Sequence, residues 1–347
     1  MREWSRWKHE ILEGYLPKFA GILGSTNETI YFVDGFAGKG QYSDNPPTPG
    51  SPLLAAQHAQ ELATTGRRRH QLRCINVEVK YFDELVGTLG AFSPPMVTNL
   101  RGTFADNLDT ILQQVAGYPT LFFLDPFGYK GMEWAMISRL ADRARARKKT
   151  ELLLRFDIEK VHRNAGWVDS HGQSAQSAIL RSVDELMGTD AWRDIAVADL
   201  PTDQRDEELT KFYMTRLEQL FPNGIVRKFA VRAIDGKLKY FLLHVTTHPR
   251  GCSAMSEVVY HVDAAYEIER RLVAAQAVAD QYVQLDLFSA PAPPTPDELR
   301  AALVKVLADA IYELRHRQGA CKFPRKVSPP EQESASGRRR GPRASGR

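Results

Sequence analysis

The stretch Ile30–Gly40 reads I-Y-F-V-D-G-F-A-G-K-G. An apolar run, Ile30–Asp34, ends in an acid and is followed at once by a glycine-rich turn. A short apolar run of this kind predicts a buried strand. Glycines in the turn allow tight backbone dihedral angles and let backbone N–H groups approach a ligand closely. The stretch therefore predicts the first strand and ligand-binding turn of a doubly wound α/β fold. A glycine-rich turn in some other fold of that class is the alternative.

Outward from this turn, strand and helix candidates alternate as far as Val161, which is typical of a parallel sheet covered on both faces. The further strand candidates are Leu72–Val79, Met96–Leu100, Thr120–Asp125 and Glu151–Asp157, and the helix candidates are Trp4–Leu23, Pro52–Thr64 and Trp134–Arg147. Two later strand candidates, Ile225–Ile234 and Leu238–Thr247, flank Asp235-Gly236, a hairpin signal. We therefore expect a Rossmann-like, mostly parallel sheet with strand order 3-2-1-4-5-7-6.

The chain divides into one expected α/β domain and appended segments. The domain covers residues 1–285, with a helical insertion at about 158–221 that contains two predicted helices, Ala178–Met187 and Glu207–Leu220. A helix at about Ala254–Gln281 closes the domain. A proline-rich linker at 286–296 and an amphipathic helix at 297–318 follow. The basic tail at 322–347 is rich in Arg, Pro, Ser and Gly, and we expect it to be disordered because it cannot bury a core.

Composition excludes several classes of protein. The 347 residues are 43% hydrophobic and 25% charged, as in folded globular proteins. The N-terminus lacks the apolar segment of a signal peptide and no run approaches 18 apolar residues, so we expect a cytoplasmic protein that does not insert into a membrane. Three widely spaced cysteines without a C-x-x-C pair exclude a disulfide framework and a zinc ribbon or iron–sulfur site built from this chain alone.

The positive charge is concentrated at one end of the chain. The net charge is +4, but residues 322–347 contain eight Lys or Arg and two Glu, which leaves residues 1–321 at about −2. Attraction to a polyanion would therefore depend on local patches or on the tail.

The glycine turn and two later acids form a candidate cofactor site. The F-A-G-K-G sequence at Phe36–Gly40 resembles the first motif of class I S-adenosylmethionine (SAM) methyltransferases. Glu78 ends the second strand candidate, where an acid can accept hydrogen bonds from ribose hydroxyls. Asp106 follows the third, where methyltransferases often place an acceptor for the adenine amino group. The alternatives are a solvated strand-end acid at Glu78 and a helix N-cap at Asp106.

The fourth strand candidate ends in Asp125-Pro126-Phe127-Gly128, which is similar to the D/N-P-P-Y/F motif of amino-methyltransferases. In those enzymes the acid and a proline carbonyl hold the target amine, and the aromatic ring stacks on the base. Here Phe127 replaces the second proline and Gly128 replaces the aromatic residue, although Phe127 or Tyr129 can supply a stacking face. Asp125 is therefore our candidate acceptor-facing acid, with Pro126 and Phe127 beside it.

Several basic and histidine residues are more simply explained without a functional role. The predicted topology places His248, Arg67–Arg69 and Arg143–Lys149 at or near the edge of the sheet opposite the candidate site. His162 and Arg163 follow the fifth strand candidate at the site edge, and a structural role is the favoured interpretation for them as well.

Five segments in order resemble the three-Cys-motif partner protein family (TcmP). They are K-H-E-I-L-E-G-Y-L at Lys8–Leu16, Y-F-V-D-G-F-A-G-K-G at Tyr31–Gly40, G-S-P-L at Gly50–Leu53, F-L-D-P-F-G at Phe123–Gly128 and Y-F-L-L-H-V-T-T-H-P-R-G at Tyr240–Gly251. The resemblance covers roughly residues 4–285. It implies a class I methyltransferase-like fold and a partner protein that carries a cysteine motif.

These observations lead to one expected function and two alternatives. We expect a SAM-dependent methyltransferase that acts on nucleic acid and works with a three-Cys-motif partner protein. The residues expected to bind SAM are Asp34, Phe36, Ala37, Gly38, Gly40, Glu78 and Asp106. The first alternative is a non-catalytic subunit that keeps the SAM fold as a scaffold for that partner. A nucleotide-dependent oxidoreductase is less favoured because the turn lacks the full G-x-G-x-x-G.

Overall fold

The computed structural model describes residues 3–64, 70–126, 128, 131–146, 148–166, 168, 174–285, and single positions at 297, 300, 301, 304 and 305. The predicted linker at 286–296 and the predicted tail at 322–347 lie outside the described residues, as do Phe127 and Arg67–Arg69. The predicted helix at 297–318 is described only at the five single positions.

A seven-stranded sheet of order β3-β2-β1-β4-β5-β7-β6 forms the centre of the fold. Its strands are β1 Thr29–Asp34, β2 Gln71–Glu78, β3 Val97–Arg101, β4 Thr120–Leu124, β5 Thr150–Phe156, β6 Ile225–Arg232 and β7 Leu238–Thr246. The first five strands pair in parallel, whereas β7 is antiparallel to both β5 and β6. The predicted strand order is confirmed, and the chain has a mixed α/β fold with a mostly parallel seven-stranded sheet.

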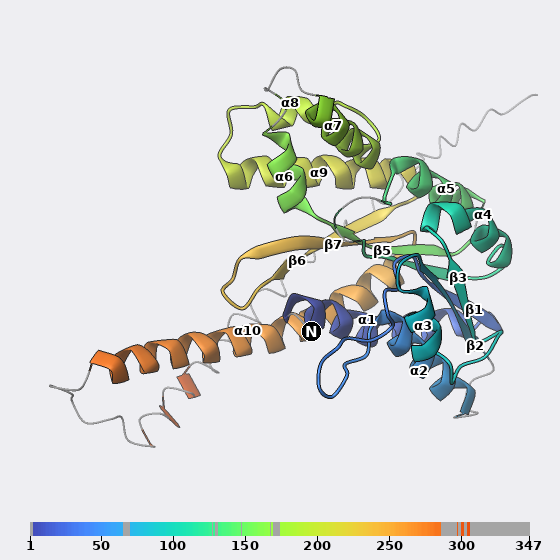
Figure 1. Ribbon diagram of the computed structural model, residues 1–347, viewed down its shortest axis with the longest axis horizontal. Coiled ribbons are helices and arrows are strands. Elements are labelled where there is room, and N and C mark those ends of the chain that lie inside the picture. Colours follow the sequence, from blue (N-terminus) through green and yellow to red (C-terminus); the bar gives the residue numbers. More distant parts are fainter. Residues whose placement is uncertain are drawn as a thin grey trace, which may run out of the picture. The chain divides into compact units, whose positions relative to one another are not determined.

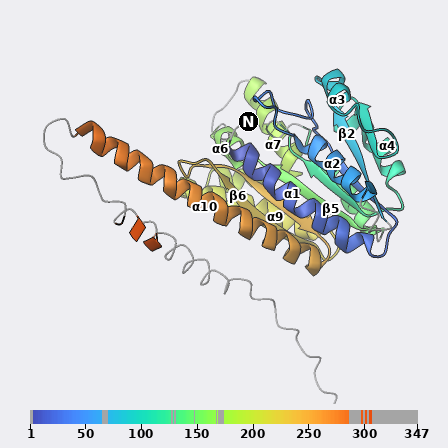
Figure 2. The same cartoon turned by 90° about the horizontal axis from the view of Figure 1, so that it is seen from below.

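Helices cover both faces of the sheet (Figure 1). On one face lie α1 Glu3–Gly24, α2 Ser51–Thr64 and α10 Pro249–Leu285, with the short α3 Phe82–Thr88 near the β2 and β3 end; on the other face lie α4 Phe104–Gln114 and α5 Trp134–Arg145. The view in Figure 2 shows α1 and α10 running side by side.

The central parallel strands β1, β4 and β5 are buried on both sides, as parallel sheets require. In β1, Phe32 belongs to the hydrophobic cluster under α1, α2 and α10, while Tyr31 and Val33 belong to the cluster under α4 and α5. Because neighbouring residues of a strand point to opposite faces, the β1 sequence is apolar at nearly every position. This is why it reads as a continuous apolar run rather than as an alternating one.

The insertion between β5 and β6 contains four helices among the described residues, two more than predicted. They are α6 Ile158–Ala165, α7 Ser174–Met187, α8 Trp192–Ala196 and α9 Thr202–Leu220. Tyr213 of α9 stacks on Phe156 of β5 with ring centroids 4.7 Å apart and an interplanar angle of 9°. The insertion is therefore packed directly on the sheet through an aromatic contact of the favourable stacked kind.

The closing helix α10 begins at Pro249, earlier than the predicted Ala254, and runs to Leu285. Its first part packs on α1 and on β6 and β7, and its far end projects beyond the sheet in both views (Figures 1 and 2). Ile268, Leu272, Val273 and Val278 on this projecting part are exposed. No helix among the described residues has the length and apolarity needed to cross a membrane.

Candidate functional site

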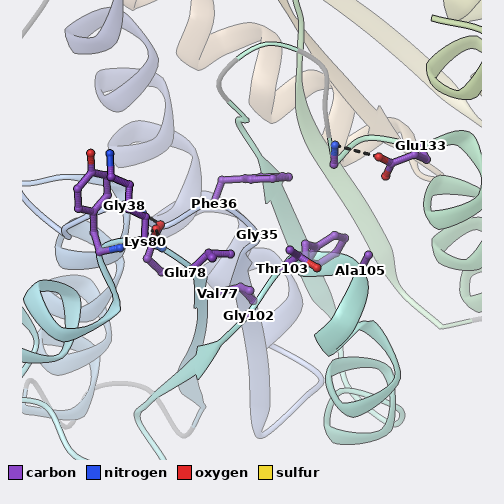
Figure 3. Close-up of a pocket in the computed structure, with 14 residues that line it drawn as sticks. Gly35, Phe36, Gly38, Val77, Glu78, Lys80, Gly102, Thr103, Ala105 and Glu133 are labelled. Atoms are coloured by element: carbon purple, nitrogen blue, oxygen red, sulfur yellow. Dashed lines mark hydrogen bonds between the residues drawn. The ribbon is translucent and has the colours of Figure 1, made fainter. Parts of the chain in front are cut away.

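A cavity of about 550 Å³ lies at the carboxyl ends of β1, β2 and β3. Its wall is formed by Gly35, Phe36 and Gly38 of the β1 turn, residues 77–81 at the end of β2, residues 102–105 before and within α4, and Gly131 and Glu133. Figure 3 shows Glu78 and Glu133 on opposite sides of Phe36. The carboxyl edge of the strands is where doubly wound folds bind ligands, and the volume falls in the range of about 300–1,000 Å³ common for small molecules.

The glycine turn keeps the cavity open beside β1. Gly38 has a φ of +63°, a backbone conformation that residues other than glycine rarely adopt. A Cβ atom built on Gly38 would meet no heavy atom within 4 Å. Because Gly38 lines the cavity, a ligand can approach the backbone of the turn closely at this position.

Backbone N–H groups hold the Glu78 carboxylate in place at the cavity wall. Its Oε2 accepts a hydrogen bond from Gly38 N at 2.7 Å. Its Oε1 accepts from Lys80 N at 2.9 Å and from Tyr81 N at 3.0 Å. A carboxylate offers about four acceptor positions, so these three donors leave room for a further donor from a ligand.

Asp34 ends β1 but points away from the cavity. The side chain is fully buried, and its oxygens accept from Ser51 Oγ at 2.6 Å and Phe36 N at 3.0 Å. Burial raises the pKa of Asp34 to about 6, although these two hydrogen bonds and the charge of Lys8 oppose the rise. Asp34 therefore stabilises the glycine turn through its hydrogen bonds to Phe36 and Ser51 and does not face the cavity.

Two further residues of the predicted cofactor set also support the turn without lining the cavity. Ala37 is buried, and its N–H donates to the carbonyl of Val77 at 3.0 Å. The carbonyl of Gly40 accepts from Gly50 N at 2.8 Å, which closes the loop between the turn and α2.

Asp106 lies in the first turn of α4 rather than at its N-cap. Thr103 is the N-cap, and the pair forms a capping box in which Asp106 Oδ2 accepts from Thr103 N at 3.1 Å while Thr103 Oγ1 accepts from Asp106 N at 3.1 Å. The N-cap interpretation of Asp106 was thus wrong by three positions. The hydrogen bonds from Thr103 lower the pKa of Asp106. Thr103 and Ala105 line the cavity, but Asp106 does not.

Asp125 lies at the end of β4, in contact with the N-terminal helix. Its Oδ2 is paired with Nζ of Lys8 in α1, and its Oδ1 lies 3.7 Å from Nη1 of Arg155 in β5. Oδ1 has no hydrogen-bond partner among the described residues. Pro126 is buried. Neither Asp125 nor Pro126 is among the residues that line the cavity.

Sequence reasoning missed two residues that the structure brings to this edge. Lys8 is separated from Asp125 by 117 positions, and only the packing of α1 brings the two together. Glu133 faces the cavity across from Glu78, and its Oε1 accepts from Gly131 N at 3.1 Å (Figure 3). The single sequence signal for Lys8 was its place in the Lys8–Leu16 segment; Glu133 had none.

Among the described residues, the basic and histidine side chains for which we favoured a structural role make structural contacts or lie away from the cavity. Arg143 is buried and donates to three backbone carbonyls and two threonine hydroxyls at the amino edge of the sheet. His162 in α6 contacts Asp206 in α9, with Nδ1 2.8 Å from Oδ1. His248 follows β7 at the edge opposite the cavity. Within the described residues, no group of three or more His, Cys, Asp or Glu side chains could hold a metal ion.

Comparisons with known proteins give distant likenesses to solved structures. A protein of the DUF519 family from Legionella pneumophila is similar at 11% identity and a TM-score of 0.45, over 76% of this chain and 92% of that one. A SAM-dependent methyltransferase from Anabaena variabilis is similar at 11% identity and a TM-score of 0.29, over 71% of this chain and 93% of that one. No protein-family model and no curated protein matches the chain.

Proposed function

We propose that this protein is a SAM-dependent methyltransferase that binds SAM in the cavity at the carboxyl ends of β1, β2 and β3. The observation that carries the proposal is the meeting of the open glycine turn with the Glu78 carboxylate at that cavity wall.

The residues that line the cavity fit an adenosyl ligand. The remaining acceptor capacity of Glu78 suits a ribose hydroxyl, which is an O–H donor. Phe36, Val79 and Phe104 supply apolar wall for a flat base. Gly38 leaves open space where any larger residue would place its Cβ. When bound, SAM supplies a methyl group on a positively charged sulfur, which an electron-rich acceptor atom can take while sulfur keeps the bonding electrons.

Asp125 is proposed to receive the acceptor. Oδ1 of Asp125 is buried and has no hydrogen-bond partner among the described residues, so an amine N–H that reached it would satisfy an unpaired acceptor. This would align the nitrogen lone pair with the methyl group, and alignment is a large part of catalysis in a group transfer. A proton is lost from the amine after transfer, and a carboxylate or water can take it.

Nucleic acid is the proposed acceptor class, and the three-Cys-motif protein is the proposed partner. The likeness of Asp125-Pro126-Phe127-Gly128 to the amino-methyltransferase motif supports an exocyclic amine of a base. The eight Lys or Arg of residues 322–347 support attraction to phosphates, which would be unspecific and sensitive to salt. The partner is supported by the five TcmP-like segments.

Calorimetric titration with SAM tests the proposal directly. In Glu78→Gln the new NH₂ group meets backbone N–H donors on whichever side it turns, so we expect SAM affinity to fall about tenfold or more. Glu84→Gln, an exposed acid of α3, serves as the matched control and should bind like the parent protein. Transfer of labelled methyl groups to total nucleic acid from cells without the gene tests the acceptor class. No SAM binding at millimolar ligand would favour the scaffold function instead.

A further inference from the structure

This inference rests on the proposed function. We propose that Lys8 is a positioning residue for methyl transfer: from α1 it holds Oδ2 of Asp125 and leaves Oδ1 turned to the acceptor.

The Lys8–Asp125 pair is buried and directly bonded. Nζ of Lys8 donates to Oδ2 of Asp125, and the two side chains are only 7% and 13% exposed. A buried pair of this kind fixes geometry, because neither group can turn to water instead. An exposed pair would give no such constraint.

Lys8 lies near two carboxyl groups at the ends of neighbouring strands. Asp34 ends β1, and β1 pairs with β4, after which Asp125 follows. Burial is the main reason that the pKa of Asp34 is raised, and the charge of Lys8 opposes the rise while that of Asp125 adds to it. Lys8 therefore supplies both a hydrogen bond and a positive charge to Asp125.

Apart from the two carboxyl groups, the polar groups that face Lys8 carry no negative charge at neutral pH. Tyr240 of β7 and Tyr42 of the loop before α2 face it with phenol groups, and on its own helix the pKa of His9 is lowered by burial and then by Lys8 itself. Burial opposes the charge of Lys8, but Asp125 and the two phenols raise the pKa of Lys8 overall. The ammonium group is therefore retained across the neutral pH range.

Arg155 is a second cation near Asp125, but it contacts the carboxylate less directly than Lys8 does. Its Nη2 is bonded to Asp157 Oδ2 at 3.1 Å, and its guanidinium lies 4.2 Å from the centre of the Tyr240 ring. Its Nη1 remains 3.7 Å from Oδ1 of Asp125, beyond hydrogen-bond distance. Lys8 is also not among the residues that line the cavity, so its loss should affect transfer rather than SAM binding.

The test compares Lys8→Met with Lys8→Arg and with the control Lys18→Met. Methionine keeps an unbranched apolar stem without the charge, and arginine restores the charge. Lys18 lies on the same helix and pairs with Glu257 at the surface at 2.9 Å. Each variant is titrated with SAM and assayed for methyl transfer to total nucleic acid.

We expect Lys8→Met to bind SAM within twofold of the parent protein and to transfer methyl groups about 100-fold more slowly, as misplacement of a reacting group does. Lys8→Arg should recover part of the rate, and Lys18→Met should match the parent. An active parent with an equally active Lys8→Met would overturn this inference and leave the proposed function standing. A parent that binds no SAM would overturn the proposed function and this inference with it.

Discussion

Oε2 of Glu78 accepts a hydrogen bond from the backbone N–H of Gly38 at 2.7 Å, which joins the end of β2 to the glycine turn after β1. Gly38 holds a φ of +63° in this arrangement. The turn and the acid thus form a single unit in which the backbone conformation of one residue fixes the carboxylate of the other.

Gly38→Ala should weaken SAM binding more than it weakens the fold. The left-handed backbone conformation costs about 1–2 kcal/mol for a residue with a Cβ, and that Cβ would enter the cavity. Gly236→Ala is the matched control, since Gly236 has a φ of +83° and equally open space in the β6–β7 turn. Chemical denaturation should give similar losses for both variants, and calorimetry should show weaker SAM binding for Gly38→Ala only. Equal SAM affinity in the two variants would place the ligand elsewhere.

Asp34→Asn should remove a pH dependence of stability. Burial raises the native pKa of Asp34 from 3.8 to about 6, so above pH 3.8 the native state holds this proton more tightly than the unfolded state. Stability from this group is therefore highest at low pH and falls as pH rises to about 6, by at most about 3 kcal/mol. Urea unfolding between pH 4 and pH 7 should show a smaller decline for Asp34→Asn than for the parent. The exposed Asp83→Asn should keep the parent's profile.

Arg143→Met should strongly destabilise the protein. Burial lowers the pKa of Arg143 to about 10, and its guanidinium donates to backbone carbonyls that include the buried one of Val115 and the partly buried one of Tyr118. Loss of the donor leaves these acceptors unpaired, at a cost of about 3 kcal/mol or more. Arg139→Met, on the same helix in an exposed pair with Asp109, should change the free energy of unfolding by less than about 0.5 kcal/mol. Similar unfolding midpoints for the two variants would contradict this account.

Tyr213→Phe should stabilise the protein. The Tyr213 hydroxyl is buried and has no hydrogen-bond partner among the described residues, and such a group costs about 1–3 kcal/mol. The ring itself stacks on Phe156 and meets Trp134 edge-on. The thermal unfolding temperature should therefore rise for Tyr213→Phe. The free energy of unfolding should fall by about 3–5 kcal/mol for Tyr213→Ala. A lower unfolding temperature for the phenylalanine variant would reveal a partner for the hydroxyl.

Much of the fold follows from local sequence patterns. Strands such as β1 and β4 are apolar at nearly every position because both faces of a parallel sheet are buried, and this makes them recognisable in the sequence. The helices α6 and α8 were not predicted because each is short, at 8 and 5 residues, and shows too few turns of periodicity. Their formation depends on packing within the insertion, such as the complete burial of Trp192.

The strands, the glycine turn and the position of Glu78 could be predicted from the sequence, because strand burial, turn geometry and strand ends are local properties of the chain. Which acids face the cavity depends on tertiary packing. Asp34 is hydrogen-bonded to Ser51 behind the glycine turn, and Asp106 belongs to the capping box of α4. Glu133 lines the cavity across from Glu78. Tertiary packing also brings Lys8 to Asp125. The direction of a side chain and the contacts between distant elements depend on how helices pack on the sheet, and residue spacing does not contain that information.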